Sequence, residues 1–171
     1  MRKKIWLPLF ISIFLILFTL LTNLPYQPKG LVENRTFEKY YDLFFTYEIT
    51  RYPTSAQVLP AQPNHEKLTL GVVVDPWNLN FGIVPAGKNF VTRFVDLTNL
   101  KEKDAKIMVR VYGNISPFVN FTKNNFILKP NENAMIEVKF YAEKAEIGNY
   151  SGEIDVVVQR PRYDFLYYFW K

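Results

Sequence analysis

The first 24 residues contain an apolar segment that constrains the fold and the location of the whole chain. Three basic residues, Arg2 to Lys4, precede a stretch from Ile5 to Leu24 that contains no charged side chain. A helix of about 20 apolar residues crosses the hydrocarbon core of a bilayer, and flanking basic residues stay on the cytoplasmic side. The sequence therefore predicts a cytoplasmic tip and transmembrane anchor over residues 1–24, with everything after Leu24 outside the cytoplasm. The residues that represent the predicted anchor are Ile5, Trp6, Leu7, Phe10, Phe14, Leu17, Leu21 and Leu24.

A cleaved secretory signal is the main alternative to this anchor. Signal peptides have an apolar region of about 7–15 residues and end in small residues. This stretch is longer, and the chain has no alanine before Ala56 and no glycine before Gly30. A pilin-type leader is disfavoured because no small residue precedes the apolar stretch and no glutamate lies early within it. A buried helix of a soluble protein is disfavoured because nothing else in the chain could cover it on all sides. We expect an uncleaved, single-pass anchor in the cell membrane.

Composition narrows the classes of function that the remainder can have. The chain has 171 residues, so the part after the anchor holds one modest domain and a linker. The absence of cysteine excludes disulfides, thiol catalysis and thiolate metal sites. The formal net charge is +5, but three of the positive charges lie at residues 2–4 and the others are interspersed with glutamate. A nucleic-acid partner is not expected, because its binding requires clustered basic residues on one face.

The sequence contains no recognisable catalytic constellation. Its one histidine, His65, lies in a proline-rich spacer next to Glu66, without the convergent partners that a triad or a metal site requires. Aspartates are scattered and form no calcium-binding loop, and no glycine-rich phosphate loop is present. We therefore predict no catalytic residue, no metal site and no cofactor, and we expect a protein that is not an enzyme.

Residues 25–66 have the composition of a juxtamembrane linker that is rich in proline and aromatic residues. Aromatic side chains between Phe37 and Tyr47 recur at helical spacing, and Thr36 is a suitable helix cap. This pattern favours a short helix at 36–48. A strand over Phe44–Tyr52, which is rich in aromatic and β-branched residues, is an alternative. A segment packed on the following domain is another.

From Lys67 onward the hydrophobic period becomes two. Apolar residues alternate with polar ones along 107–111, 134–140 and 154–158, and less regularly along 68–74 and 91–97. Strands with this pattern bury one face and expose the other, as in an antiparallel sandwich. Turn residues separate them at 84–87, 101–104, 129–131 and 147–149. The fold class we predict is mainly β: one antiparallel sandwich over 67–159, preceded by a single transmembrane helix.

Four motifs in this region resemble a known family. They are Leu79-Asn-Phe-Gly-Ile-Val-Pro-Ala-Gly87, Leu97-Thr-Asn99, Leu128-Lys-Pro-Asn-Glu132 and Gly148-Asn-Tyr-Ser-Gly152-Glu-Ile154. Together they resemble the immunoglobulin-like domains of major sperm protein and of the abnormal-spindle and hydin group, over about residues 68–159. Asn131 stands where that family usually has glycine, and asparagine also tolerates the left-handed conformation. The resemblance implies a binding or scaffolding module without catalytic residues, and it does not identify the partner.

Four sequons for N-glycosylation follow the predicted anchor. Each has the form Asn-x-Ser or Asn-x-Thr, and each falls in a predicted turn or in the linker, where a glycan could be accommodated. An asparagine-rich composition with a preference for turns is the alternative explanation. The acceptor residues are Asn34, Asn114, Asn120 and Asn149.

Residues 160–171 are unusually aromatic. As a strand, this segment would present apolar side chains on both faces, so it would be covered twice or would need a partner. Packing on the chain's own sheet, or on the aromatic segment 37–52, is one explanation. Docking on a neighbouring membrane protein or in the bilayer interface, where tyrosine and tryptophan are favoured, is the other. The candidate contact residues are Tyr163, Phe165, Tyr167, Tyr168, Phe169 and Trp170.

These observations favour an extracytoplasmic interaction module as the function. The leading hypothesis is a scaffolding or assembly subunit of a cell-envelope complex, whose partners are the bilayer and another envelope or membrane protein. The first alternative is a surface domain that recognises a glycan or another envelope polymer through exposed aromatic residues. The second is a strand-donating chaperone or filament component that uses its C-terminal strand.

Overall fold

The computed structural model describes residues 10–14, 17, 28, 30–61 and 78–168. These residues belong to two compact units, Met1–Gly30 and Leu31–Lys171. In the first unit the described residues 10–14 and 17 are helical and exposed. Within the described part of the chain, no helix has both the length and the apolar character needed to cross a bilayer.

The predicted anchor therefore remains a prediction. Phe10, Phe14 and Leu17 are helical, with 75%, 63% and 53% of their surface exposed. The other predicted anchor residues lie outside the described residues: Ile5, Trp6, Leu7, Leu21 and Leu24.

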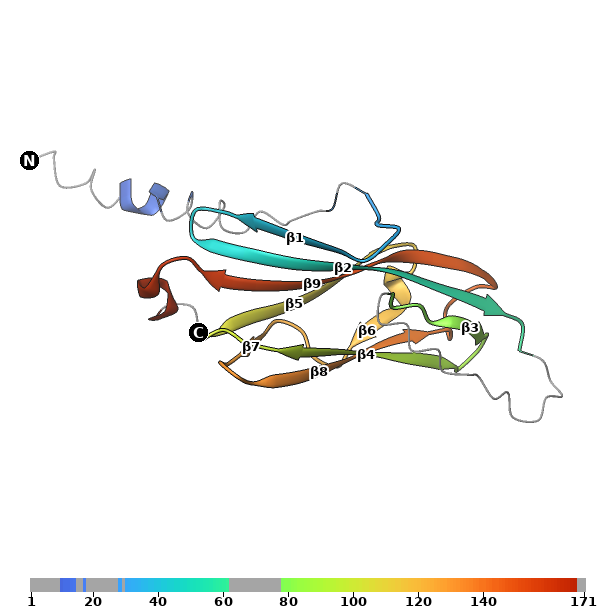
Figure 1. Cartoon of the computed structure of the whole chain (residues 1–171). Coiled ribbons are helices and arrows are strands. Elements are labelled where there is room, and N and C mark those ends of the chain that lie inside the picture. The colour runs from blue at the N-terminus through green and yellow to red at the C-terminus, as the bar shows by residue number, and fades with distance from the viewer. Residues whose placement is uncertain (1–9, 15–16, 18–27, 29, 62–77, 169–171) are drawn as a thin grey trace, which may run out of the picture. The chain divides into compact units, whose positions relative to one another are not determined.

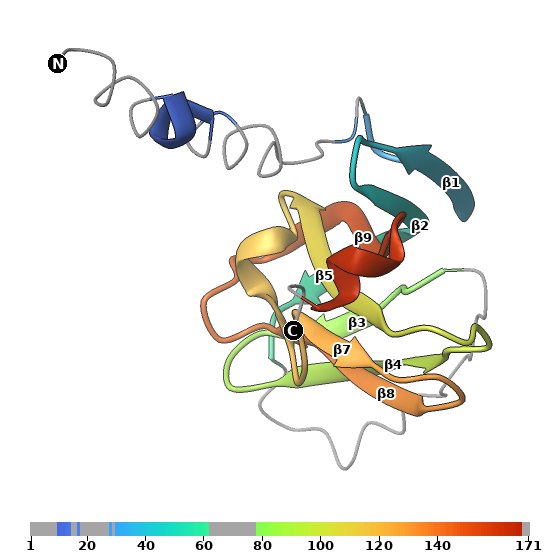
Figure 2. The same cartoon turned by 90° about the vertical axis from the view of Figure 1, so that its left-hand side faces the viewer.

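The second unit is mainly β and consists of two sheets stacked as layers (Figures 1 and 2). The larger sheet, sheet A, has the order β1-β2-β9-β5-β7, with β3 added in parallel to β2. The smaller sheet, sheet B, has the order β4-β8-β6, and its pairs are antiparallel. Sheet A contains β1 (Thr36–Tyr41), β2 (Phe45–Leu59), β3 (Gly82–Pro85), β5 (Ala105–Gly113), β7 (Phe126–Leu128) and β9 (Gly148–Pro161). Sheet B contains β4 (Phe90–Thr98), β6 (Val119–Phe121) and β8 (Asn133–Tyr141). The 3-10 helices are η1 (Ser116–Phe118) and η2 (Asp164–Tyr168).

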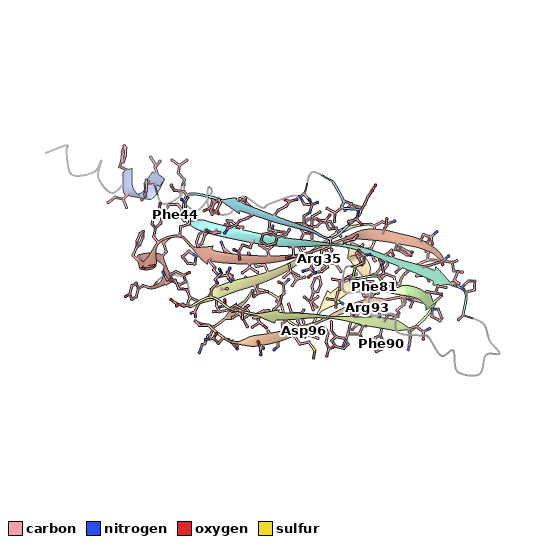
Figure 3. All side chains as sticks on the ribbon, viewed as in Figure 1. Arg35, Phe44, Phe81, Phe90, Arg93 and Asp96 are labelled. Carbon is pink, nitrogen blue, oxygen red and sulfur yellow. The ribbon has the colours of Figure 1, made fainter. Side chains whose placement is uncertain are left out.

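The core lies between the two sheets and follows the predicted period of two. On β8, Ile136, Val138 and Phe140 are fully buried, while the side chains between them point outward. Phe140 contacts the ring of Phe81, at 5.6 Å between ring centroids. Figure 3 shows Phe81 close to Arg93, whose Nε donates to the Asn80 carbonyl at 2.6 Å. The predicted strands over 91–97, 107–111, 134–140 and 154–158 are confirmed, and the one expected at 68–74 lies outside the described residues.

The main difference from the sequence prediction concerns β2, which lies within the expected linker. This strand pairs with β9 from Phe45–Pro161 to Val58–Gly148 and contributes Ala56 and Val58 to the core. Residues 78–81 and β3 then pair with the second half of β2, as shown by the Phe81 N–H bond to the Ser55 carbonyl at 2.8 Å. Because β2 is central in sheet A, a sandwich that begins at Lys67 lacks one of its strands.

The helix expected at 36–48 is wrong, because these residues form β1, a tight turn and the start of β2. The Asp42 side chain accepts hydrogen bonds from the N–H groups of Phe44 and Phe45, at 2.8 and 2.6 Å. Such an aspartate turn offers the backbone an alternative to helix. The pairing of β2 with β9 then decides between the two conformations, since tertiary contacts override local helical spacing. The strand that the sequence left open over 44–52 is the one that forms.

Two positions of the family-like motifs have a clear conformational role. Asn131 adopts a positive φ of 58° in the turn between β7 and β8, as its tolerance of the left-handed conformation predicts. At Gly152 a Cβ atom would overlap the Tyr112 carbonyl oxygen and the Ile115 side chain. Asn131 permits the sharp turn into β8, and Gly152 permits the close approach of β9 to β5.

The C-terminal segment departs from the predicted strand after Pro161. The last partner of β9 is Phe45, the first residue of β2, and no neighbouring strand continues beyond that pair among the residues that the structure describes. The chain turns there, where the Arg162 N–H donates to the Phe44 carbonyl at 2.8 Å, and then forms η2. A 3-10 helix satisfies backbone groups locally where a sheet can no longer do so.

A truncation series tests the role of β2. A chain that starts at Lys67 should lose cooperative unfolding, because the β9 edge and the core lose the β2 side chains. A chain that starts at Leu31 should keep a sharp thermal transition. Adding a peptide of residues 45–59 to the shorter chain should restore its far-ultraviolet circular dichroism. An equally sharp transition in both chains, at the same temperature, would show that β2 is dispensable.

Candidate functional site

Five large exposed side chains gather at one end of sheet A, where the β1–β2 turn meets the segment after β9. Arg162 joins the two segments, because its backbone N–H binds Phe44 and its guanidinium donates to the Asp42 carbonyl at 2.7 Å. Figure 3 labels Phe44 at this end. We call the group the aromatic end, with exposures from 43% at Tyr163 to 83% at Tyr168. It consists of Tyr41, Leu43, Tyr163, Phe165 and Tyr168.

Cations lie against the rings of the aromatic end. The Arg162 guanidinium is 5.8 Å from the ring centroid of Tyr41 and 5.9 Å from that of Tyr163. The ammonium of Lys39 is 5.6 Å from the Tyr41 ring centroid. Such contacts attract a cation to the face of the ring, and the attraction is weak at exposed sites. The surface therefore combines apolar area with positive charge.

Only some of the C-terminal residues predicted as contact residues lie at the aromatic end. Tyr163 and Phe165 stack at 5.8 Å between ring centroids, and Tyr168 is the most exposed member. Tyr167 points to the side, where Lys103 lies 5.5 Å from its ring centroid. Phe169 and Trp170 lie outside the described residues. Sequence reasoning missed Tyr41 and Leu43, although the Asp42 turn between aromatic residues was a signal for an exposed hairpin tip.

A groove of about 680 Å³ lies next to the aromatic end. Thr46, Glu48 and Arg160 come from the inner face of sheet A, and the loop after β4 forms the facing wall. Glu48 pairs with both Arg160 and Lys39, at 2.6 and 3.4 Å. Cations are in excess along the groove, which suits an acidic or phosphate-bearing ligand. Its charged lining residues are Lys39, Lys101, Lys103, Arg160, Arg162, Glu48 and Glu102.

Asn99 fixes the loop that forms this wall. It is 2% exposed, and its side-chain amide donates to the carbonyls of Lys103 and Leu128 at 2.9 and 3.0 Å. Its Oδ1 accepts from the Lys101 N–H at 3.2 Å and from the Arg160 guanidinium at 3.2 Å. One buried side chain therefore ties the ends of β4 and β7 to β9.

A cluster of buried charges lies on the outer face of sheet A. Arg51 donates to both carboxylate oxygens of Glu153, at 2.6 and 3.0 Å, and to Glu38 at 2.6 Å. The Val32 N–H donates to Glu153 at 2.9 Å, so the segment before β1 is bound to this face. Asp155 and Glu153 are both fully buried, and Asp155 lies 4.0 Å from Arg51. One arginine thus faces two buried carboxyls of β9.

The two carboxyls differ in their affinity for a proton. Burial opposes ionisation of Glu153, but hydrogen bonds from Arg51, Asp155 and the Val32 backbone outweigh it and lower its pKa. Burial raises the pKa of Asp155 to about 8, and the hydrogen bond to Glu153 and its charge act in the same direction. Neither oxygen of Asp155 has a hydrogen-bond donor among the described residues. A protonated Asp155 that donates to Glu153 resolves this arrangement.

Sequence reasoning missed this cluster because β9 alternates as an exposed strand does. Glu153 and Asp155 occupy the face that the period of two assigns to solvent. The signal in the sequence was Val157, which interrupts the polar side of the strand and is 2% exposed in the structure. Burial of that outer face depends on residues far away in the chain, such as Ile49 of β2, which no local pattern reveals.

The outer face of sheet B is a second exposed surface. Phe90 and Tyr141 pair across β4 and β8, with 5.8 Å between ring centroids, and Phe94 follows along β4. A depression of about 300 Å³ adjoins Tyr141 and Asn120. Figure 3 labels Phe90 toward the end of the sandwich away from Phe44. This surface alternates aromatic and polar side chains.

The four sequon asparagines are all exposed. Asn114 and Asn149 lie where β9 begins, and Asn120 lies on the outer face of β6. The Oδ1 atom of Asn114 accepts from the Ser151 N–H at 2.7 Å. Asn34 lies in the segment before β1. Glycosylation of these residues remains a prediction.

No arrangement for metal binding is found in the described parts of the chain, since no three His, Cys, Asp or Glu side chains converge there. His65 lies outside the described residues. No protein-family model, curated protein or solved structure matches the chain.

Replacing Asn99 with alanine tests its role in holding the groove wall. Two carbonyls, one N–H group and Arg160 would lose their partner, and an unsatisfied buried polar group costs about 1–3 kcal/mol. The free energy of unfolding in urea should fall by at least that amount. Asn133→Ala, at an exposed position of β8 next to the same turn, is the matched control and should change it little. Equal effects of the two substitutions would contradict the assignment.

The pH dependence of stability tests the protonated Asp155. An unfolded aspartate releases its proton near pH 4, whereas the folded one keeps it to about pH 8. This contribution to stability is fully present below pH 4 and is lost as the pH rises through 8. Asp155→Asn should therefore flatten the fall in unfolding free energy between pH 5 and 9. The exposed Asp96→Asn variant should keep the wild-type slope, and parallel curves for all three proteins would rule out the shifted proton.

Proposed function

We propose that the chain is a single-pass, membrane-anchored interaction module whose immunoglobulin-like sandwich faces away from the cytoplasm. In this proposal it is a scaffolding or assembly subunit of a cell-envelope or membrane protein complex. The anchor rests on the uncharged stretch Ile5–Leu24. The interaction role rests on the surfaces of the second unit and on the family resemblance of its motifs.

Strand order supports the immunoglobulin-like assignment. The constant-type fold has sheets with the orders A-B-E-D and C-F-G. The order β4-β8-β6 corresponds to B-E-D, and the order β5-β9-β2 corresponds to C-F-G. The strands at positions B to F also follow one another along the chain in that order, as β4, β5, β6, β8 and β9. The difference is that β2, which takes the position of G, precedes the other strands in the chain. The four motifs that resemble the major sperm protein type lie on this framework.

The aromatic end is the observation that carries the interaction role. Its five apolar side chains remain exposed although the sandwich has a complete core of its own. Monomeric proteins rarely expose large clusters of apolar side chains, and such clusters with a polar rim mark interaction sites. Tyrosine is favoured at such sites because it combines a large apolar ring with a hydroxyl group.

Affinity purification from solubilised membranes tests the proposed function. The full chain should sediment with membranes and resist an alkaline carbonate wash, and mass spectrometry of the mature protein should find residues 5–24 intact. A stoichiometric integral-membrane partner should copurify. Loss of residues 5–24 in the mature protein, with recovery in the soluble fraction, would overturn the proposal.

The outer face of sheet B favours one second candidate, recognition of a glycan or another envelope polymer. Phe90, Phe94 and Tyr141 offer ring faces of the kind on which sugars stack, beside the depression at Asn120. In this case Phe94→Ala should abolish retention on a glycan array, with the melting temperature unchanged. Leu43→Ala, at the aromatic end, is the control and should bind as the wild type does.

A further inference from the structure

The two ends of β9 differ in character. The aromatic end adjoins its last residue, Pro161, and presents apolar side chains with Arg162 among them. The first residues of β9 adjoin two of the four sequon asparagines, Asn149 within the strand and Asn114, which accepts from the Ser151 N–H. A strand of this length, Gly148 to Pro161, separates the two ends by about 45 Å at 3.3–3.4 Å per residue. The unit is therefore polarised along its strands.

Arg162 gives the aromatic end a specific charge preference. Its guanidinium is exposed between Tyr41 and Tyr163, and it forms no ion pair with a carboxylate among the described residues. Lys101, in the adjoining groove, is also exposed. Guanidinium groups bind phosphate oxygens in a bidentate manner. An anionic headgroup would satisfy Arg162 while the rings contact the acyl boundary.

We infer that the aromatic end docks on the headgroup region of the bilayer, with Tyr41, Leu43, Phe165 and Tyr168 at the acyl boundary and Arg162 on lipid phosphate. This inference rests on the proposed function, since it requires the unit to be held at a membrane. It names the lipid surface as the partner of this end and leaves the other exposed surfaces of the unit, such as the outer face of sheet B, for the protein partner.

Chain length permits this docking. Val32 lies eight positions after Leu24, and a fully extended chain of that length spans roughly 26–29 Å. Val32 is bound to Glu153, which lies eight residues before Pro161 on β9. Eight strand residues also span about 27 Å. The aromatic end therefore reaches the bilayer surface when β9 stands upright with Pro161 toward the lipid.

The chain contains no cysteine, so a spin label reacts only with a cysteine that is introduced by substitution. A nitroxide is attached to Leu43→Cys, Tyr168→Cys or Ile147→Cys in the full chain. Ile147 is 62% exposed and adjoins the opposite end of β9, so it is the matched control. The proteins are reconstituted in vesicles of phosphatidylcholine with one quarter phosphatidylglycerol, and in phosphatidylcholine alone. Accessibility to oxygen and to a water-soluble nickel chelate is then measured by electron paramagnetic resonance.

Docking predicts a several-fold higher ratio of oxygen to nickel accessibility at the labels on residues 43 and 168 than at the label on 147. Removing phosphatidylglycerol, or adding Arg162→Gln, should lower that ratio. Equal ratios at all three positions would overturn the inference. If the protein then still resists a carbonate wash of the vesicles, the anchor stands and only the docking fails. Shielding of residues 43 and 168 in native membranes, but not in pure lipid, would also overturn it, in favour of a protein partner.

Discussion

The pairing of β2 with β9 is the interaction on which the rest of the second unit depends. It joins residues 45–58 to residues 148–161, about a hundred positions apart, over most of the length of both strands. On its inner side it completes the core with Ala56 and Val58, and burial of a valine or isoleucine side chain stabilises a fold by about 1.5–3 kcal/mol. At one end it brings the β1–β2 turn beside Arg162, and on the outer side it aligns Arg51 with Glu153 and Asp155.

The buried charges make the register of this pairing specific. A buried ion pair contributes little net stability, but removing one partner is costly because the other charge remains uncompensated. Arg51 is bound by Glu153 and Glu38, and Glu153 also accepts from Val32. A shifted register of β2 would turn Arg51 away from its partners. The same cluster fixes where the chain enters the sandwich, which determines how far the aromatic end extends from that point.

Local patterns predicted the strands that alternate clearly, and they failed where distant contacts decide the outcome. The period of two along β8 and the turn at Asn131 depend on neighbours in the sequence, so both were accessible to sequence reasoning. In β2 the aromatic residues fit a helix and a strand equally well, and only the partner strand β9 selects one. The aromatic tail was recognised from composition, whereas Tyr41 and Leu43 join it through Arg162, a contact across the fold. Asp155 is buried because other parts of the chain cover the outer face of sheet A. The alternating pattern of β9 alone predicts that this face is exposed to solvent.

Native-state hydrogen exchange measures the dependence on β2 most directly. Amides of the most stable elements exchange only through global unfolding, whereas those of a docked linker exchange through local opening at a smaller free energy. We predict that the amides of Ile49, Arg51 and Val58 exchange with the same free energy as those of Val156 of β9 and Val109 of β5. Fast exchange along the whole of β2, with β9 and β5 still protected, would contradict it, because the sandwich would then be complete without the upstream strand.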